Sequence, residues 1–250
     1  MNEELHWNKI GDNYNNEIFD VFKSDKKKRL PFYFKKHGNK KHTAIDFGCG
    51  NGKSFSHIAP LFKDIIAIDI SQELINQAKT RSFTNIKFLQ KDLSKRNLKL
   101  DPVDFIFCCN VVMLPVIEKN QFMLQNISHA LKLKGKAVLV LPALESVMFS
   151  SWRLIDWYKR EGTKPSEIDQ DELDYFSGSK RDIIQGIIHI DKVPTKHYSA
   201  NELEVLFTES GLKITSLDKV EYDWNSEFSS PPEWMKSPYP WDWLVECKKA

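Results

Sequence analysis

Residues 44–52 read Ala-Ile-Asp-Phe-Gly-Cys-Gly-Asn-Gly, a short apolar run that carries an acid and then breaks into alternating glycines. Glycine has no Cβ, so a backbone with Gly48, Gly50 and Gly52 can turn sharply and let a ligand lie against it. The following residues 53–62 have apolar side chains at helical spacing, and the free N–H groups of a helix start would face the same place. The stretch therefore predicts a strand, a glycine turn and a helix start that cradle a nucleotide-like ligand.

Three glycine-rich motifs can be compared with this loop. The dinucleotide fingerprint G-x-G-x-x-G/A requires a small residue where this chain has Lys53. The phosphate loop of nucleoside triphosphatases ends in Gly-Lys-Ser, as residues 52–54 do, but its first glycine would fall on Phe47. The pattern D-x-G-x-G-x-G fits every position of residues 46–52. We favour this last pattern, and a nucleoside triphosphatase is the alternative from another class of enzyme.

Polar residues stand at or near the ends of several short apolar runs. Asp46 lies within the first run, while Asp69, Asp92 and Asn110 follow later ones, most of them separated by helical patterns. This alternation predicts βαβ units and a parallel sheet, in which ligands bind beyond the carboxyl ends of the strands. Asp69 follows the glycine loop by about 20 residues, the spacing at which an acid reaches a ribose. Each acid could alternatively be an ordinary cap or turn residue.

The glycine loop and the acids together resemble class I S-adenosylmethionine-dependent methyltransferases over residues 40–141 and, more weakly, 198–249. The resemblance implies a doubly wound, Rossmann-like α/β fold with a mostly parallel seven-stranded sheet whose last strand is antiparallel. It implies S-adenosyl-L-methionine as cofactor, with Asp69 on the ribose, Asp92 on the adenine amino group and Leu93 beside the ring. No metal is expected. The implied cofactor-binding residues are Tyr14, Asp46, Gly48, Cys49, Gly50, Asn51, Gly52, Asp69, Ile70, Asp92, Leu93, Asn110 and Val111.

Two aromatic residues near the N-terminus resemble the segment that closes over the cofactor in many small-molecule members. They are Trp7 and Tyr14, in the order W-x-x-(apolar)-x-x-x-Y. For Trp7 we favour the alternative, an anchor of the first helix in the core. For Tyr14 both interpretations stay open.

The composition limits the class of protein. Of the 250 residues, 41% are hydrophobic and 28% charged, and the formal net charge is +2. This composition is typical of one globular domain and makes a nucleic-acid partner unlikely by charge alone. No apolar stretch reaches the length of a membrane span, and the polar N-terminus predicts no secretory signal. The four cysteines lack metal-type spacing and indicate a reduced, cytoplasmic protein, which we expect to be a monomer or a homodimer.

We expect a single methyltransferase domain, residues 1–250, in four parts. These are an N-terminal helical region (1–42), a cofactor-binding half (43–142), a cap insertion (143–197) and a C-terminal helix with a strand hairpin (198–250). Apolar spacing predicts helices over 3–24 and 116–132, a fifth strand over 136–141, and hairpin strands over 212–222 and 241–248. The Pro- and Trp-rich segment 223–240 between these strands either walls the acceptor pocket or covers the sheet edge.

Residues 23–42 are rich in lysine. They could form a patch for an anionic partner such as RNA. We favour a solvated face around apolar residues that pack inward, namely Leu30, Phe32, Tyr33 and Phe34. The runner-up function is therefore an RNA or protein methyltransferase that uses this region.

The chemistry of methyl transfer requires mainly alignment of the acceptor and exclusion of water. A general base is needed only if the acceptor loses a proton early; candidates are His189, His197 and Glu145, with Tyr175 or Tyr222 as orienting hydroxyls. For each of them a structural or surface role is the favoured alternative. Residues 110–113 read Asn-Val-Val-Met rather than the N-P-P-Y of adenine and glutamine methyltransferases. We therefore expect a small-molecule acceptor with an oxygen, nitrogen or carbon nucleophile, and a non-catalytic nucleoside-binding protein is a further alternative.

Overall fold

The computed structural model describes residues 3–11, 19–169, 172, 181–190 and 193–250. A seven-stranded sheet with the order β3-β2-β1-β4-β5-β10-β9 forms its centre. The first five strands in this order are parallel, and β10 runs antiparallel to both β5 and β9. The strands are β1 (Asn39–Phe47), β2 (Phe62–Asp69), β3 (Ile86–Gln90), β4 (Val103–Cys109), β5 (Leu131–Pro142), β9 (Leu212–Glu221) and β10 (Trp241–Lys249). The predicted fold class, including the antiparallel last strand, is confirmed.

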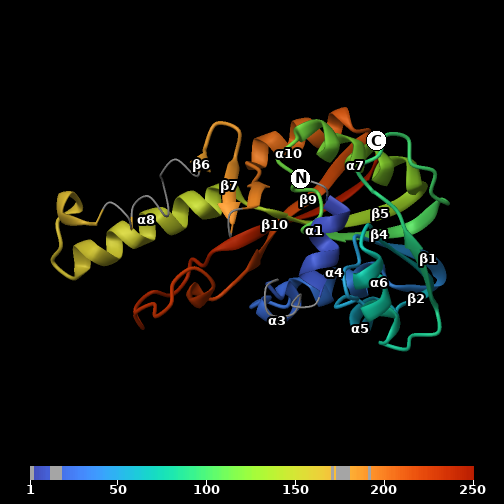
Figure 1. Cartoon of the computed structure of the whole chain (residues 1–250), viewed down its shortest axis with the longest axis horizontal. Coiled ribbons are helices and arrows are strands. Elements are labelled where there is room, and N and C mark those ends of the chain that lie inside the picture. The colour runs from blue at the N-terminus through green and yellow to red at the C-terminus, as the bar shows by residue number, and fades with distance from the viewer. Residues whose placement is uncertain (1–2, 12–18, 170–171, 173–180, 191–192) are drawn as a thin grey trace.

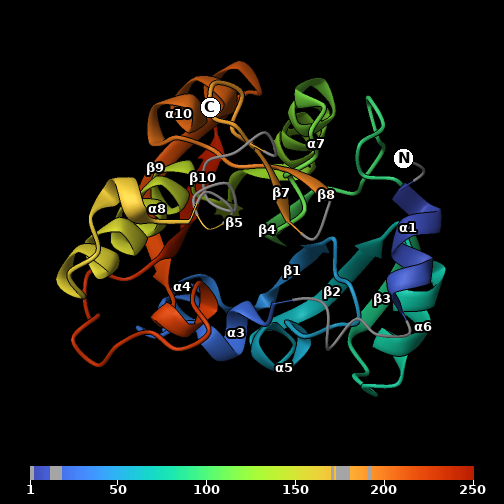
Figure 2. The same cartoon turned by 60° about the vertical axis from the view of Figure 1, so that its left-hand side comes forward.

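Helices cover both faces of the sheet (Figure 1 and Figure 2). On one face α7 and α10 bury apolar side chains against the sheet, and on the other face α3, α4 and α5 do so. The two largest apolar clusters of the described residues therefore lie on opposite faces of the sheet, because side chains alternate between the faces of each strand. The helices are α1 (Glu3–Ile10), α3 (Val21–Ser24), α4 (Arg29–His37), α5 (Phe55–Ile58), α6 (Gln72–Lys79), α7 (Ile117–Ala130) and α10 (Ala200–Glu209).

The helix starts follow local capping signals. Ser71 precedes α6, and its hydroxyl accepts a hydrogen bond from the backbone N–H of Leu74. Ser199 caps α10 through the N–H of Glu202 in the same way. These side chains satisfy backbone donors that a helix start leaves without partners, which is why serine marks both boundaries in the sequence.

Two predicted helices are shorter than their apolar spacing suggests. The helix expected over 53–62 is a single turn, α5, because β2 already begins at Phe62. The helix expected over 3–24 is not continuous: α1 ends at Ile10, and α3 begins after Asp20, whose carboxylate accepts a bond from the N–H of Lys23. Residues 12–18 between them, with Tyr14, lie outside the described residues.

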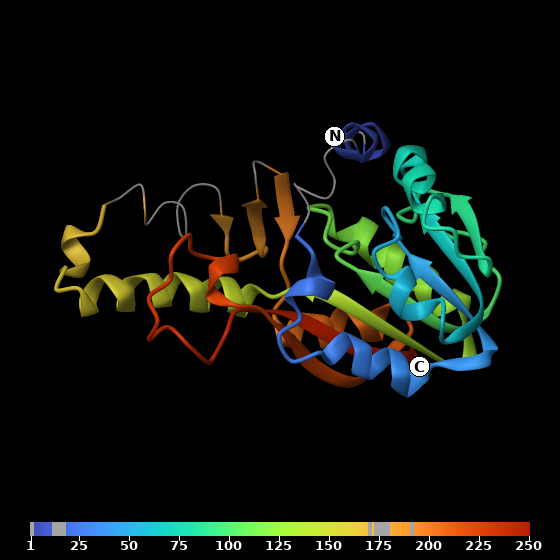
Figure 3. The same ribbon diagram turned by 90° about the horizontal axis from the view of Figure 1, so that it is seen from below.

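The insertion after β5 forms a long helix, α8 (Leu144–Arg160), which extends away from the sheet (Figure 1 and Figure 3). Its apolar side packs on segment 223–240 through a cluster that includes Leu154, Trp224 and Phe228. Trp157 packs at the edge of this cluster, whereas Trp152 is 55% exposed. A small sheet of β6 (Arg181–Asp182), β7 (Ile187–Ile190) and β8 (Val193–Lys196) completes the insertion; short 3-10 turns lie at Pro165–Glu167 and Trp224–Ser226.

The lysine-rich region is held by acids of the last strands. Lys27 Nζ lies 2.7 Å from the carboxylate of Glu221, and Arg29 pairs with Asp218. Leu30, Tyr33 and Phe34 are buried below them, but Phe32 is 52% exposed, contrary to expectation. Because α4 has one buried side only, Phe32 falls on its solvent side. The charges therefore form a solvated face with partners of its own.

Candidate functional site

The glycine loop after β1 has a backbone that only glycine adopts readily. Gly48, Gly50 and Gly52 have φ angles of 83°, 51° and 79°, in the left-handed region. A Cβ on Gly48 would lie 2.2 Å from a methyl carbon of Val111, well inside contact distance. The N–H groups of Gly48 and Cys49 both donate to the carbonyl of Ile68, each at 2.9 Å. The loop is thus pressed between the ends of β2 and β4, with bare backbone on its surface.

Asp69, at the end of β2, joins the glycine loop to the start of α6. One carboxylate oxygen accepts the N–H of Gly50 at 2.8 Å, and the other accepts the N–H of Ser71 at 2.9 Å. The side chain is 7% exposed, and its pKa is raised because burial outweighs these hydrogen bonds. Each oxygen keeps a further lone pair that can accept a hydroxyl hydrogen. Asp69 can therefore hold a diol, such as a ribose, directly beside the loop.

Asp46 lies beneath the loop at the end of β1 and is almost fully buried. The Ser54 hydroxyl donates to its carboxylate, and Asp69 lies near enough to repel it. Burial raises the pKa of Asp46 from 3.8 to about 7, against the effect of Ser54. The site therefore has two buried carboxylates side by side, an arrangement that favours a cationic ligand group.

Asp92 and Leu93 follow β3 at the same edge of the sheet. Asp92 accepts the N–H and the hydroxyl of Ser94 at 3.0 and 2.6 Å. Burial raises its pKa, but these bonds and the charge of Lys95 outweigh burial and leave the pKa lowered. Leu93 is 5% exposed and packs in the core. Ile70 lies between β2 and α6, where its carbonyl accepts the side-chain amide of Gln90.

Asn110, directly after β4, has a positive φ of 52°. Its N–H donates to the carbonyl of Val140 at 3.0 Å, which fixes it between β4 and β5. Its Oδ1 is buried and has no hydrogen-bond partner among the described residues. An unpartnered buried acceptor is costly, so this oxygen is a candidate contact for a ligand donor. With Asp46, Asp69 and Asp92, the structure places all four polar residues at the predicted edge.

Helix α1 lies against α6 beside this edge (Figure 2). The Asn8 side chain accepts a hydrogen bond from the Ser71 hydroxyl at 2.6 Å, and Gln77 donates to the carbonyl of Gly11 at 2.8 Å. Trp7 is partly exposed, and its ring lies in a T-shaped arrangement with the ring of His6, with 5.5 Å between centroids. These polar contacts attach the first helix beside Asp69, and Trp7 is half-buried.

The structure separates the candidate general bases. His189 is exposed on β7, and His197 is buried with Nδ1 3.1 Å from the carbonyl of Thr195. Glu145 accepts the N–H of Ala200 at the start of α10, while its second oxygen is buried without a partner among the described residues. Tyr175 lies outside the described residues. Tyr222 directly follows β9, and its side chain contacts the strand ends through Asp242.

Tyr222 contacts Asp242, an acid that the sequence did not predict to be part of the site. The Tyr222 hydroxyl donates to the Asp242 carboxylate at 2.7 Å, and the Asn110 side chain donates to the same carboxylate. Asp242 pairs with Pro142 in the sheet and therefore lies at the carboxyl end of β5. Burial raises its pKa to about 7, against both hydrogen bonds. An acid directly before the apolar run of residues 243–245 is the signal that could have identified it.

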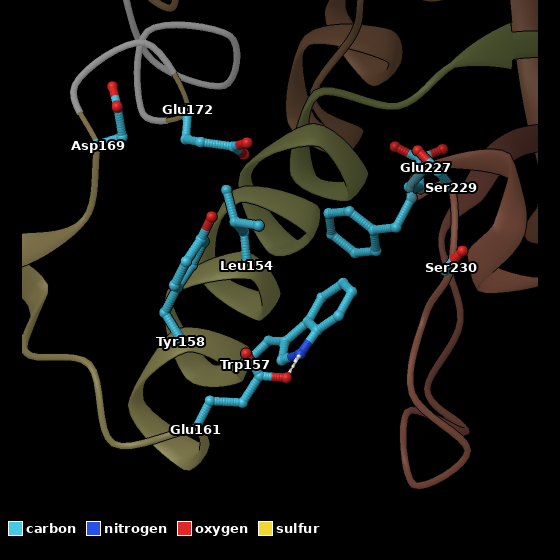
Figure 4. Close-up of a pocket in the computed structure, with 10 residues that line it drawn as sticks. Leu154, Trp157, Tyr158, Glu161, Asp169, Glu172, Glu227, Ser229 and Ser230 are labelled. Atoms are coloured by element: carbon cyan, nitrogen blue, oxygen red, sulfur yellow. Dashed lines mark hydrogen bonds between the residues drawn. The ribbon is translucent and has the colours of Figure 1, made fainter.

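A hollow lies beside the insertion helix, between α8, Asp169, Glu172 and segment 227–230 (Figure 4). Its volume is about 800 Å³, and it is lined by aromatic rings and carboxylates. The Trp157 indole donates to Glu161 at its rim. No residue of the glycine loop lines it, so it is separate from the cradle at the strand ends.

No helix in the described part of the chain has both the length and the apolar character that a membrane crossing requires. Within the same ranges, no group of three or more His, Cys, Asp or Glu side chains is arranged to hold a metal ion. All four cysteines are free.

Known proteins share both the motifs and the fold. Residues 44–135 match the model of a family described as a methyltransferase domain. The putative methyltransferase 235L of Invertebrate iridescent virus 6 is 34% identical over 108 residues, which are 42% of this chain. The aligned region spans only 38% of that relative's length.

Solved structures match almost the whole chain. A DhpI–SAM–HEP complex has a TM-score of 0.63 at 14% identity and covers 98% of this chain and 95% of its own. A SAM-dependent methyltransferase from Anabaena variabilis has a TM-score of 0.62 at 16% identity, covering 99% and 93%. The N-methyltransferase NodS from Bradyrhizobium japonicum, bound to S-adenosyl-l-homocysteine, has 0.60 at 12% identity, covering 100% and 99%. The chain thus contains a region similar to a methyltransferase domain, residues 44–135, within a fold that it shares with solved SAM-dependent methyltransferases.

Proposed function

We propose that this chain binds S-adenosyl-L-methionine across the ends of β1, β2 and β4 and catalyses methyl transfer to a small-molecule acceptor. The observation that carries the proposal is the contact between Gly50 and Asp69, because it holds an acid for a ribose directly beside bare loop backbone. Complexes of similar folds with SAM or S-adenosyl-l-homocysteine, DhpI and NodS among them, support the choice of ligand.

The residues fit this cofactor in charge and shape. Because Gly48 has no Cβ, ligand atoms can approach its backbone closely, whereas a Cβ there would collide with Val111. Asp69 offers lone pairs for two hydroxyls, and Asp92 offers an acceptor for an adenine amino group. Buried Asp46 and the free Oδ1 of Asn110 suit the positive ammonium of a methionine moiety. When bound, the cofactor would supply an electrophilic methyl group.

The protein's own part in such a reaction is to align the acceptor and exclude water. Fixed backbone at residues 48–52 and 110–111 gives a rigid surface for this alignment. A small acceptor is favoured because the basic residues near the N-terminus already have acidic partners, such as Asp218, Glu221 and Asp223. Residues 110–113 also lack the N-P-P-Y of adenine and glutamine methyltransferases. RNA or protein as acceptor is therefore the less favoured alternative.

Isothermal titration of the purified chain with S-adenosylhomocysteine tests cofactor binding. We expect binding by the wild-type chain and no detectable heat for Asp69→Ala, which leaves the N–H of Gly50 without its acceptor. Asp64→Ala is the matched control, because Asp64 is an exposed acid on the same strand and forms an ion pair with Lys63. ATP with magnesium should give no heat. Binding of ATP instead of S-adenosylhomocysteine would refute the proposal and favour a triphosphatase.

A further inference from the structure

Asp242 lies where four parts of the chain meet at the strand ends. It pairs with Pro142 at the end of β5 and accepts a hydrogen bond from Asn110 at the end of β4. The hydroxyl of Tyr222, directly after β9, donates a further hydrogen bond to the Asp242 carboxylate. The backbone of the neighbouring Trp241 is bonded to Ser146 on the cap helix α8. The carboxylate is thus fixed between the cofactor half and α8, and the residue as a whole is half-buried.

The segment before α3 connects this carboxylate with the glycine loop. Phe19 packs edge-on against the Tyr222 ring, with 4.8 Å between centroids. The next residue, Asp20, reaches Lys53 directly after the loop, at 3.5 Å. Residues 19–20 therefore span from Lys53 to Tyr222, so that the region beside Asp242 and Asn110 is bounded by the glycine loop, the N-terminal segment and the cap.

We propose that Asp242 accepts the hydrogen bond, and then the proton, of the hydroxyl or amino group that is methylated, and that Tyr222 is the residue that positions it. This inference rests on the proposed methyltransferase function and specifies its acceptor as a protic nucleophile. The Asn110 side chain, which we propose to contact the methionine moiety of the cofactor, also donates a hydrogen bond to Asp242. The Asp242 carboxylate therefore lies where an acceptor would meet the methyl group.

Methyl transfer to an O–H or N–H group releases a proton, and the Asp242 carboxylate can accept it. When an O–H or N–H acceptor forms its bond to the methyl carbon, the carbon–sulfur bond breaks and its electron pair stays on sulfur. The acceptor heteroatom then carries a surplus proton, which passes to Asp242. The products are the methylated acceptor, a neutral thioether and a protonated carboxyl group, which returns its proton to solvent after release. No oxidant, metal or further reactant is needed.

The surroundings of Asp242 support a base that works near neutral pH. Burial raises its pKa to about 7, while Tyr222 and Asn110 lower it and Glu227 raises it. Cys109, on β4, also faces it, but its thiol stays protonated because burial raises its pKa far above the usual value. A general base is most effective when its pKa is close to the working pH. Activity should therefore rise with pH as Asp242 loses its proton.

Asp242→Asn and Tyr222→Phe test the proposal. Both variants keep the shape of the side chain, and both should bind S-adenosylhomocysteine as the wild-type chain does. For a panel of phenols, alcohols, amines and carboxylic acids, we expect Asp242→Asn to lower turnover of the protic acceptors by about 100-fold or more. The rise of kcat/KM with pH should disappear. In Tyr222→Phe the midpoint of this rise should move to higher pH, because the hydrogen bond that lowers the pKa of Asp242 is removed.

A measurement that needs no turnover accompanies these assays. In protein with 13C-labelled aspartate, and with S-adenosylhomocysteine bound, the Asp242 carboxyl signal should titrate near neutral pH and shift when a protic panel member is added. Asp104→Asn is the control, because Asp104 is bonded to Thr43 and Lys132 at the opposite end of β4.

Distinct results would overturn the proposal. Loss of S-adenosylhomocysteine binding in Asp242→Asn would make Asp242 a cofactor ligand, and unchanged turnover would make it structural. The proposal would also be overturned if the enzyme methylated carboxylic acids alone, because these are already ionised near neutral pH and need no base. It would likewise be overturned if no alcohol, phenol or amine of the panel were methylated or shifted the Asp242 signal. Absence of S-adenosylhomocysteine binding by the wild-type chain would instead refute the proposed function itself.

Discussion

Replacing Asp46 by Asn should stabilise the cofactor-free protein, and more so at high pH than at low pH. Asp46 is 2% exposed, and its pKa in the folded chain is raised to about 7, mainly by burial. Asn has nearly the same shape as a protonated carboxyl group, and its carbonyl oxygen can still accept the hydroxyl of Ser54. The substitution therefore removes the buried charge and keeps the hydrogen bond.

The pKa shift of Asp46 sets the magnitude. The rise from 3.8 to about 7 means that the fold prefers the protonated form, so the ionised form costs it about 4 kcal/mol above neutral pH. A folded-state pKa above the unfolded value gives a contribution that is complete below about pH 4 and is lost as the pH rises through about 7. Between about pH 5 and pH 8 the free energy of unfolding should fall by about 2–3 kcal/mol because of Asp46.

Urea unfolding of the cofactor-free protein at about pH 5 and pH 8 measures this effect. The unfolding free energy of the Asn variant should fall by about 2–3 kcal/mol less than that of the wild type between the two pH values. Asp242 contributes to the same slope in both proteins, so the comparison between them reports the Asp46 carboxylate together with its repulsion of Asp69. Asp64→Asn, an exposed carboxyl on β2, is the control and should leave the slope unchanged. An Asn variant with the slope of the wild type would refute the reasoning.

Three further outcomes can be checked with the same preparations. Gly48→Ala should lower the unfolding free energy by about 1–3 kcal/mol and prevent S-adenosylhomocysteine binding, because its Cβ meets Val111 in a left-handed backbone; urea unfolding and calorimetry test this. Alanine at Lys26 and Lys27 should change stability by less than about 1 kcal/mol, and a filter-binding assay that found RNA affinity lost with them would favour the RNA alternative. Burial raises the pKa of Glu246, but hydrogen bonds from Lys36, Thr215 and His37 outweigh burial and leave this pKa lowered. The wild-type chain should therefore be more stable than Glu246→Gln at neutral pH, and thermal melts should show this difference vanish as the pH falls through the folded-state pKa of Glu246.

The predictable part of the fold is the part with local signals. The glycine loop, the serine caps and the apolar runs between them gave the order of strands and helices in the first half of the chain. Boundaries were less accurate where burial is partial. The strand predicted from Lys136 begins at Leu131. The prediction missed its first residues because Lys132, Leu133 and Lys134 are exposed and carry no apolar pattern. Hydrogen bonding to a neighbouring strand leaves no mark on side chains that face solvent.

The candidate site shows the same division. Asp69 and Asn110 could be predicted because, in parallel strands, a polar residue that follows an apolar run is brought to the same edge of the sheet. Tyr222 obeys the same rule, because β9 runs parallel to β5 on the far side of β10. Asp242 does not, because β10 is antiparallel and presents its beginning at that edge. There the acid precedes its apolar run, and a search for acids after strands passes over it.

The buried acids at this edge explain why the site is not optimised for stability. Asp46, Asp69 and Asp242 all have a raised pKa, and in each case burial is the main cause. Removing these charges would make the empty protein more stable, so their presence indicates a ligand that repays the cost. The proposed cofactor has an ammonium group, whose charge suits Asp46, and a ribose, whose hydroxyls can donate to Asp69. Asp242 stands apart from this pair, beyond Asn110, and the same logic assigns it to a group that delivers a proton rather than a fixed positive charge.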